Sequence, residues 1–552
     1  MRVRKLFIYI LKLPSQLRLI LSTDSQTKAV CHYFKKLRKP LSKSQQVVLV
    51  QCVEDLFYFG LFGQVVTSLS EQHPIRVEQF VLRSLNVGEA KSFWIFAKSR
   101  LIMNTLFTNK WKNLYQSFCH GVAYSSTSFQ PLNDLVDLYR AWSCWNNILN
   151  KQMLIDLVIN QIHVGDLVND SFLRFKPAAT VDLKNPYLLV LLWQSYRDVR
   201  RAQNYFDRVK PKLYLTSYST YIQHGIAVRT ALQYGVKVFS FGNYQEFAKE
   251  LTLSDWVHTK NPDNYADEFS KLDFKDEKLA EADAALTLRI DGVIDSATSY
   301  MKKSAYAKSS HPVPNVHGAV VIFLHDFFDS PHVYRNMVFP DFWEWVCFTI
   351  DCLIKNNIPF FVKPHPNQIS LSSSVLDELK QKYPKIQEIP SSITNKQLVD
   401  AGMACAVTVY GTVAHEMAYM GITTIACAHH PHISFDICKT AKNKEEYFEL
   451  LEAYEDINID KSMLYHQALA FYYMHNLNLN AEDKSLRDKV WVELSAFCKL
   501  DANNYDLVES LKDISQLPAY KVHTTNWINI ITDNLKFNVK HNCTDSQEVF
   551  LL

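Results

Sequence analysis

The residues best suited to chemistry lie where predicted strands end, and the segment FVKPHPNQIS (361–370) is the first example. An apolar run stops at Lys363, and two prolines then bracket His365 and precede Asn367. Proline fixes φ and removes a backbone donor, so the loop is preorganised and its imidazole is displayed. A lysine beside an imidazole suits a phosphate that becomes a leaving group. The alternative is an ordinary turn between a strand and a helix, which proline also favours.

A second strand exit is VTVYGTVAHEMAYMGITT (407–424). The pattern predicts a strand ending at Tyr410, a sharp turn at Gly411 and a helix capped by Thr412. The free amides of a helix N-terminus bind phosphate. Glu416, one turn further on the same face, could accept hydrogen bonds from ribose hydroxyls. The structural alternative is a plain α/β crossover, which needs the same turn and cap.

Carboxylates are spaced by one helical turn in HVGDLVNDSFLRF (163–175). Asp166 and Asp170 are candidates for a general base or a nucleophile. Arg174, a further turn along, could hold the carboxylate of an acidic sugar. The alternative is a solvated ladder of charges on a helix surface.

A metal site has to be considered in LHDFFDSPHVY (324–334), where four potential ligands lie within eight residues of a strand: His325, Asp326, Asp329 and His332. The Ser330-Pro331 pair favours a rigid turn instead. We therefore expect Asp329 and Ser330 to line a donor pocket, and we expect no metal.

Two further segments carry weaker candidates. In YIQHGIAVR (221–229), His224 and Arg229 are expected on a helix that faces the other domain, where Arg229 could neutralise a phosphate. The alternative is a cap and a surface arginine. The loop AHHPHISF (428–435), with His429, His430 and His432, could touch a donor sugar or be a mobile loop.

The elements that position these residues follow an α/β rhythm. Strands are predicted at 47–50, 75–81, 213–215 and 236–241, and the pattern restarts after a polar stretch that ends near 318. Two Rossmann-like domains are predicted, an N-terminal one (46–305) and a C-terminal one (319–502), joined by a linker (306–318). An N-terminal basic amphipathic segment (1–45) precedes them. A tail (503–552) follows them and either packs back on the N-terminal domain or stands apart. The predicted fold class is α/β, with two parallel-sheet domains facing a central cleft.

Composition narrows the function. The 59 basic and 56 acidic residues nearly balance, so nucleic acid is not an expected partner. The eleven cysteines are scattered and odd in number, which favours a reducing compartment. No apolar run is long enough to span a bilayer. Residues 1–22 are basic and apolar, which fits either a segment lying on a membrane surface or a first helix packed on the protein.

Together, the segments HDFFDSPHVYRNMVFPDFWEWVCFTI, FVKPHPN and YGTVAHEMAYMGITTIA resemble the bacterial surface-polysaccharide glycosyltransferases of GT-B fold, over about residues 160–450. The His-Pro motif is similar to that of transferases that use CMP-activated Kdo or sialic acid. This resemblance implies that His365 contacts the nucleotide phosphate and that Gly411, Thr412 and Glu416 hold phosphate or ribose. The short acidic-Gly motif that carries the base is present only in reverse order, as Gly165-Asp166, so the base role is not transferred.

We therefore expect a glycosyltransferase that moves a sugar from a nucleotide-sugar donor onto a bacterial surface glycan or a lipid-linked glycan. The donor we favour is CMP-Kdo or a similar CMP-activated acid sugar. The enzyme would need no metal and no cofactor beyond the nucleotide sugar, and it would be cytoplasmic, free or peripheral on the inner membrane. The alternatives are a UDP- or GDP-sugar transferase, a nucleotide-sugar 2-epimerase of the same architecture, or a non-catalytic subunit of capsule assembly.

Overall fold

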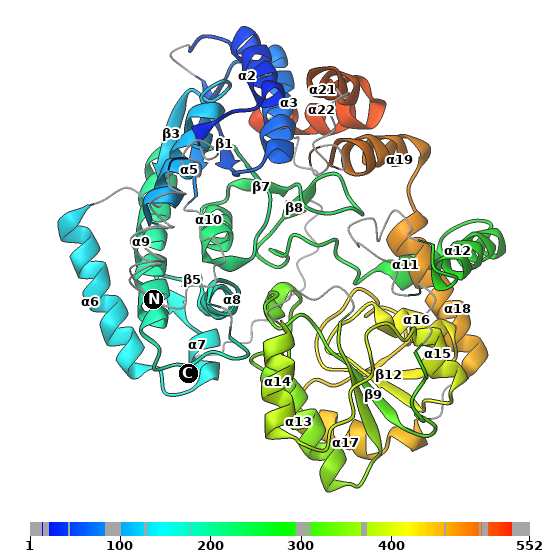
Figure 1. Ribbon diagram of the computed structural model, residues 1–552. Coiled ribbons are helices and arrows are strands. Elements are labelled where there is room, and N and C mark those ends of the chain that lie inside the picture. The colour runs from blue at the N-terminus through cyan, green and yellow to red at the C-terminus, as the bar shows by residue number, and fades with distance from the viewer. Residues whose placement is uncertain are drawn as a thin grey trace, which may run out of the picture.

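The computed structural model describes most of the chain: residues 14, 21–41, 45–82, 101–125, 130–176, 178–293, 306, 311–365, 372–457, 460–495, 498 and 506–532. Within these residues two largely parallel β-sheets lie side by side, one in the upper part of Figure 1 and one at the lower right. The α/β fold class with two Rossmann-like sheets, predicted from the sequence, is confirmed.

The first sheet has the strand order β3-β2-β1-β6-β7-β8 in the described part of the chain. Its strands are β1 (Gln46–Cys52), β2 (Ile75–Val81), β3 (Gly121–Ser125), β6 (Leu213–Thr216), β7 (Lys237–Ser240) and β8 (Lys249–Leu251). Only β8 pairs antiparallel, with β7, while the other pairs are parallel. The sequence patterns predicted β1, β2, β6 and β7 but not the edge strands β3 and β8.

Helices cover both faces of the first sheet, which explains the continuous apolar run of β1. Val48 and Val50 pack in a cluster with residues of α3 (Leu56–Gln72), whereas Leu49 between them packs against α9 (Pro186–Val209) and α10 (Tyr221–Gln233). The domain also contains α5 (Leu101–Tyr115), α6 (Pro131–Asn147), α7 (Lys151–Ile155), α8 (Gly165–Phe175) and a small hairpin of β4 (Val158–Ile159) and β5 (Ile162–His163).

The second sheet has the order β10-β9-β11-β12-β13 among the described strands and is parallel throughout. The strands are β9 (Val320–Phe323), β10 (Phe360–Lys363), β11 (Cys405–Val407), β12 (Thr423–Ala426) and β13 (Lys439–Thr440). Its helices are η3 (Pro331–Val333), α13 (Phe342–Lys355), α14 (Ser372–Lys382), α15 (Asn395–Asp400), α16 (Val413–Tyr419), α17 (Lys444–Glu452) and η4 (Tyr454–Asp456). Alternate β9 residues again serve the two faces: Ile322 packs with α13, and Val321 packs with α15 and α16.

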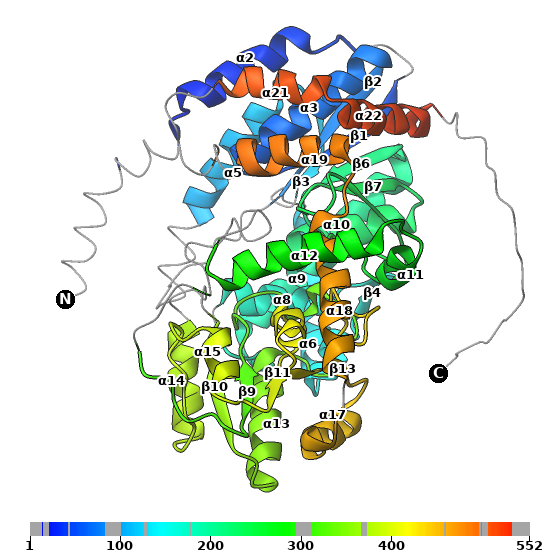
Figure 2. The ribbon, with the colours of Figure 1, turned by 90° about the vertical axis from the view of Figure 1, so that its right-hand side faces the viewer.

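The C-terminal part of the chain returns to the first sheet (Figure 2). After α18 (Lys461–Tyr472) and η5 (Tyr473–Leu477), the chain forms α19 (Ala481–Arg487), η6 (Asp488–Leu494), α21 (Leu507–Gln516) and α22 (Pro518–Ile531). Buried Leu486, Leu511 and Trp527 join the core around α3. The apolar side chains of these helices therefore complete the N-terminal core, beginning before the predicted boundary at 502.

Two other segments also pack across the predicted domain boundaries. The helix α2 (Ser25–Leu37) places Val30 and Phe34 in the core beside α3. The helices α11 (Tyr265–Ser270) and α12 (Lys275–Ile290) pack against α18 of the second half. Of the predicted basic amphipathic segment (1–45), residues 1–13, 15–20 and 42–44 lie outside the described residues.

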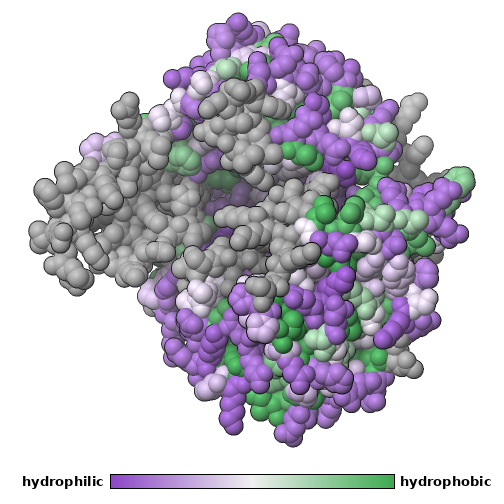
Figure 3. All heavy atoms as spheres, turned by 45° about the vertical axis from the view of Figure 1, so that its right-hand side comes forward, coloured by the Kyte–Doolittle hydropathy of each residue, from purple (hydrophilic) through white to green (hydrophobic). Residues whose placement is uncertain are grey.

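None of the helices in the described part of the chain combines the length and apolar character needed to cross a membrane. On the face shown in Figure 3, the described surface is mostly hydrophilic, with apolar residues in small separate groups and a hollow between the upper and lower halves. The described cysteines, which comprise all but Cys543, have free thiols.

Candidate functional site

The site lies at the carboxyl ends of three neighbouring strands, β10, β9 and β11, where parallel sheets place their functional loops. The exits of these strands surround a pocket of about 250 Å³. It is lined by Arg289, Phe323, Leu324, His325, Tyr334, Lys363, Pro364, His365, Asn395, Thr408, Tyr410, Gly411, Thr412, Val413 and Glu416. We call it the donor pocket, after the role that the sequence predicts for these residues. Six of the predicted donor-binding residues therefore share one cavity.

Lys363, the last residue of β10, is a buried cation at this pocket. Its Nζ donates a hydrogen bond of 2.9 Å to Oδ1 of Asn395 and lies 5.7 Å from the ring centroid of Phe323. Burial lowers the pKa of Lys363 to about 8, while the charge of Glu416 acts in the opposite direction. Because the hydrogen-bonding partner is a neutral amide, an anion in the pocket would stabilise the charged form of Lys363.

Two imidazoles flank this lysine. Burial lowers the pKa of His365, with Asp326 opposing the shift. Burial lowers the pKa of His325 to about 3, so this ring is neutral, and its Nε2 accepts from the Val409 amide at 3.3 Å. The Thr408 hydroxyl lies 3.0 Å from the same nitrogen. The neutral ring of His325 therefore fixes the start of the turn after β11.

The turn after β11 is tight because it lacks a side chain at Gly411. The Gly411 amide donates to Thr408 Oγ1 at 3.2 Å, and a Cβ added at Gly411 would lie only 2.8 Å from that oxygen. Thr412 precedes α16, as predicted, but its side chain makes no capping hydrogen bond. Its backbone is already helical (φ −61°, ψ −13°), whereas capping side chains extend from β-region backbone.

Glu416 is buried at the side of the donor pocket and is already engaged. It forms an ion pair with Arg289 (2.9 Å), and its other oxygen accepts from Tyr306 (2.5 Å) and Asn395 (3.2 Å). Burial opposes ionisation, yet the Arg289 charge holds the pKa of Glu416 below its usual value. The network links Glu416 through Asn395 to Lys363, so the carboxylate positions the cations of the pocket.

Asp166 and Arg229, predicted to face the cleft separately, form an ion pair within the N-terminal half. Two hydrogen bonds of 2.7 and 2.5 Å join the guanidinium to the carboxylate, and both side chains are buried. Burial alone would raise the pKa of Asp166, but Arg229 lowers it to about 2. Arg229 also donates to the His163 carbonyl. With these contacts, Arg229 acts on Asp166 rather than on the donor pocket.

Asp170 instead reaches the second half of the molecule. Its Oδ1 lies 2.7 Å from Nδ1 of His332, and its Oδ2 accepts from the backbone amide of His332 at 3.2 Å. Burial disfavours the charged imidazole, but the Asp170 charge outweighs it and raises the pKa of His332. With Nδ1–H donating to Asp170, the Nε2 of His332 carries the lone pair of a general base.

The His332 pair lies beside the donor pocket. Tyr410 lines that pocket, and its hydroxyl donates to the carbonyl of Ser330 at 3.1 Å, two residues before His332. Asp329 accepts from the Ser330 amide, and burial raises the pKa of Asp329. Asp329 and Ser330 therefore lie at the junction of the two halves, next to the lining of the pocket.

The remaining predicted residues have other placements. Arg174 donates to the Phe328 carbonyl at 3.3 Å across the two halves. His224 is buried, its Nε2 contacts Gln223 at 3.1 Å, and burial lowers its pKa to about 3. Asn367 lies outside the described residues.

Three residues of the site were missed by the sequence analysis: Arg289, Asn395 and His332 as a base. Arg289 lies in the last turn of α12, far along the chain from Glu416, and Asn395 follows the capping residue of α15. Only His332 stood in a segment already singled out, where it was weighed as a metal ligand.

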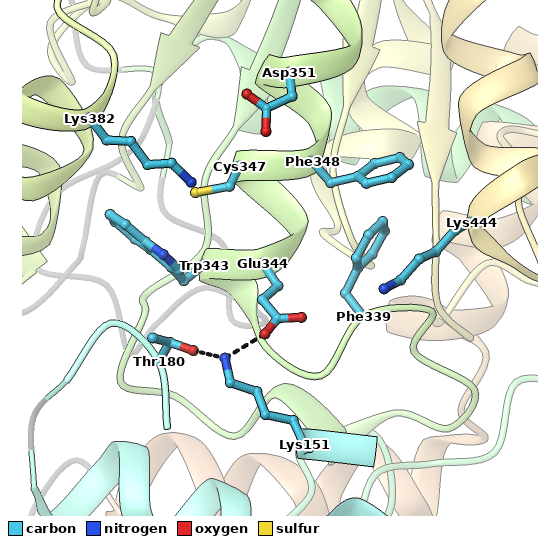
Figure 4. Close-up of a pocket in the computed structure, with 10 residues that line it drawn as sticks. All are labelled: Lys151, Thr180, Phe339, Trp343, Glu344, Cys347, Phe348, Asp351, Lys382 and Lys444. Carbon is cyan, nitrogen blue, oxygen red and sulfur yellow. Dashed lines mark hydrogen bonds and ion pairs between the residues drawn. The ribbon is translucent and has the colours of Figure 1, made fainter. Parts of the chain in front are cut away.

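A second cavity, of about 340 Å³, lies at another junction of the two halves (Figure 4). Lys151 of α7 pairs there with Glu344 at 2.5 Å and with Asp341 at 3.2 Å, and Thr180 donates to Asp341. Asp341 also caps α13, so this polar tie fixes the start of that helix to the N-terminal half. Since no predicted site residue lines this cavity, it is separate from the donor pocket.

No protein-family model and no curated protein matches the chain. Solved structures similar to it include KpsC of Thermosulfurimonas dismutans, a beta Kdo 2,4 transferase. The two chains are 13% identical, the match covers 47% of this chain and 79% of that chain, and the TM-score is 0.28. A UDP-GlcNAc 2-epimerase from Neisseria meningitidis bound to UDP-GlcNAc has 9% identity, coverages of 78% and 96%, and a TM-score of 0.25. MurG of Acinetobacter baumannii has 10% identity, with 81% of this chain and 99% of that chain covered, and a TM-score of 0.24.

Proposed function

We propose that this chain is a glycosyltransferase that moves a sugar from a nucleotide-sugar donor onto a glycan acceptor. One observation carries the proposal: the exits of β10 and β11, on either side of β9, bring Lys363, His365 and the turn at Gly411 to a single pocket. Cations, an imidazole and the start of a helix at the carboxyl edge of a parallel sheet suit the phosphates of a nucleotide.

The pocket would act on the leaving group. As the bond between the anomeric carbon and the phosphate oxygen breaks, negative charge grows on the nucleotide phosphate. The charged Lys363 stabilises this oxygen, and the fixed hydrogen bond to Asn395 holds the ammonium in place beforehand. His365, which follows Pro364, donates a hydrogen bond to the departing phosphate, since burial lowers its pKa and favours the neutral ring.

The Asp170–His332 pair would act on the acceptor. His332 Nε2 takes the proton of the acceptor hydroxyl while that oxygen forms a bond to the anomeric carbon and the nucleotide departs with the bonding electrons. Asp170 holds the ring in the required tautomer and stabilises the imidazolium that forms. Asp170 thus acts through His332. Asp166, on the same helix as Asp170, is paired with Arg229.

The donor we favour is CMP-Kdo or a similar CMP-activated acid sugar, on the resemblance of the His-Pro motif. The acceptor we propose is a bacterial surface glycan or its lipid-linked precursor, met in the cytoplasm or at the inner face of the membrane. The cations at the donor pocket belong to side chains, and the proposal gives no step to a metal ion.

A thermal-shift panel of CMP, CDP, UDP and GDP tests the nucleotide. A ligand that binds only the folded state raises the midpoint, by about 2.7 kcal/mol of stability at one hundred times its Kd. We expect CMP to give the largest shift. Stabilisation by UDP alone would remove the Kdo or sialic acid assignment, and no shift with any nucleotide would contradict the proposal.

His365→Ala should abolish the shift and leave the unliganded midpoint nearly unchanged, because the side chain lines the pocket. The matched control is His466→Ala, which removes an exposed histidine on α18. An undiminished shift in the His365 variant would take this residue out of the site. Sugar release that needs no acceptor would favour the 2-epimerase over the transferase.

A further inference from the structure

Three side chains of the types that commonly bind metals converge in the loop between β12 and β13, outside the lining of the donor pocket. They are His430, His432 and Cys438, and their ligand atoms all lie within 4.8 Å of one another. All three side chains are buried, with exposed fractions of 1%, 0% and 6%. From the sequence, the two histidines are expected to touch a donor sugar or to belong to a mobile loop, and no role is predicted for Cys438.

The second observation is an unsatisfied histidine. His432 is fully buried, and among the described residues neither of its ring nitrogens has a hydrogen-bonding partner, nor does Nδ1 of His430. The two rings stack at 3.9 Å between centroids. A buried polar atom without a partner costs about 1–3 kcal/mol, so three such nitrogens in one place indicate a missing ligand.

The ring nitrogens are in the form that binds a metal. Burial lowers the pKa of His432 well below the usual value, and it lowers the pKa of His430 to about 3. Both rings are therefore neutral, with lone pairs available.

The donor set selects the metal. Two imidazoles and one thiolate suit Zn²⁺, which bonds nitrogen at about 2.0 Å and thiolate at about 2.3 Å. In a tetrahedral site these bonds place nitrogen and sulfur about 3.6 Å apart. Cys438 Sγ lies 3.2 Å from His430 Nε2, so this pair already has nearly the required spacing. The ligand atom of His432 lies within 4.8 Å of the other two, so a shift of no more than about 1 Å would complete the set.

We propose that His430, His432 and Cys438 bind one Zn²⁺ ion, with a water molecule or a further side chain as the fourth ligand. Binding replaces the thiol proton of Cys438 with the metal, engages Nε2 of His430 beside that sulfur and satisfies one of the two free nitrogen atoms of His432. This site is independent of the proposed glycosyl transfer, because none of its ligands lines the donor pocket.

The position of the site indicates a structural role. Cys438 packs with Ala414 of α16 and Ala426 of β12. The start of α16 lines the donor pocket, so Cys438 contacts the helix that forms part of that lining. At the other end of the loop, His429 contacts Asp263 at 2.6 Å. A metal would therefore tie the loop 427–438 to the sheet and hold α16 in place.

The test uses untagged full-length protein, because a histidine tag binds Zn²⁺ itself. After removal of metal and titration with Zn²⁺, elemental analysis should find one equivalent retained after dialysis. Co²⁺ in its place should show the charge-transfer band of a thiolate ligand. Zn²⁺ should also raise the thermal midpoint of the metal-free protein.

Cys438→Ala and His432→Gln should each lose the bound equivalent, and Cys438→Ala should lose the Co²⁺–thiolate band. Cys405→Ala is the matched control, since Cys405 is also buried but lies in β11. Absence of stoichiometric Zn²⁺ in the parent protein would overturn the proposal, as would equal binding by a folded Cys438 variant. If neither variant folds, the Co²⁺ spectrum of the parent protein decides, because a spectrum without the thiolate band excludes Cys438.

Discussion

His332 and Asp170 meet at 2.7 Å, although one belongs to the loop after β9 and the other to α8 of the N-terminal half. The same carboxylate also accepts from the His332 amide, so both the ring and the backbone of this loop are fixed. The contact places a carboxylate-oriented imidazole where the two halves meet, beside the pocket proposed for the donor.

Asp170→Asn should lower the rate of sugar transfer by about 100-fold or more, because His332 loses its orientation and its charge partner. The pKa of His332 is raised by Asp170, so the rise of the rate with pH should move to lower pH in the variant. The measurement is the pH profile of kcat/KM, with the nucleotide thermal shift as a check that the donor still binds. Exposed Asp207→Asn is the control, and an unmoved pH profile would show that Asp170 is only structural.

Lys363 gives nucleotide binding a pH dependence of defined sign. Its pKa is about 8, and the charged form attracts the phosphate. Affinity should therefore be constant below this pH and fall by up to about tenfold per pH unit above it, as the ammonium loses its proton. Titration calorimetry between pH 7 and about 9.5 checks this range.

Lys363→Met should bind nucleotide weakly at every pH and show no fall above pH 8, because the group that titrates is gone. Lys385→Met, at an exposed position, should retain the parent profile. A parent affinity that stays flat between pH 7 and about 9.5 would exclude Lys363 from the phosphate site.

The part of the site that the sequence predicted is the part formed by neighbouring strand exits. The segments at 361–365 and 407–412 each showed an apolar run ending in polar residues, and parallel strands deliver such residues to one edge of a sheet. The α/β rhythm predicts that these strands are parallel and share one edge, so the convergence of Lys363, His365 and Gly411 could be expected, whereas the order β10-β9-β11 is seen only in the structure.

The pairings could not be predicted because they join residues far apart in the chain. Arg289 reaches Glu416 over 127 residues, and Arg229 reaches Asp166 over 63. Local spacing made Asp166 and Asp170 look equivalent, one turn apart on one helix. Only the tertiary packing decides that the first meets a guanidinium and the second an imidazole.

Gly411→Ala should weaken nucleotide binding strongly, by about tenfold or more, because the new Cβ would lie 2.8 Å from Thr408 Oγ1. Relief of this clash breaks the hydrogen bond from the Gly411 amide and displaces the turn from the pocket. Gly121→Ala, where a Cβ meets nothing within 4 Å, is the matched control. The nucleotide thermal shift measures both, and equal shifts would mean that the turn does not contact the ligand.

The Asp166–Arg229 pair should stabilise the N-terminal half at neutral pH rather than take part in chemistry. Asp166→Asn leaves the buried guanidinium without its counter-charge, which costs about 3–5 kcal/mol. The folded-state pKa of Asp166 is about 2, below its usual 3.8, so the stabilisation is complete above pH 3.8 and is lost as the pH falls toward 2.

The difference in thermal midpoint between the parent and the Asp166→Asn variant should therefore be large at pH 7 and shrink between pH 3.8 and about 2. The double variant with Arg229→Met should recover part of the loss, since it removes the uncompensated charge. Equal midpoints at neutral pH would show that the pair contributes nothing, and Asp166 would again be a candidate for the chemistry of the cleft.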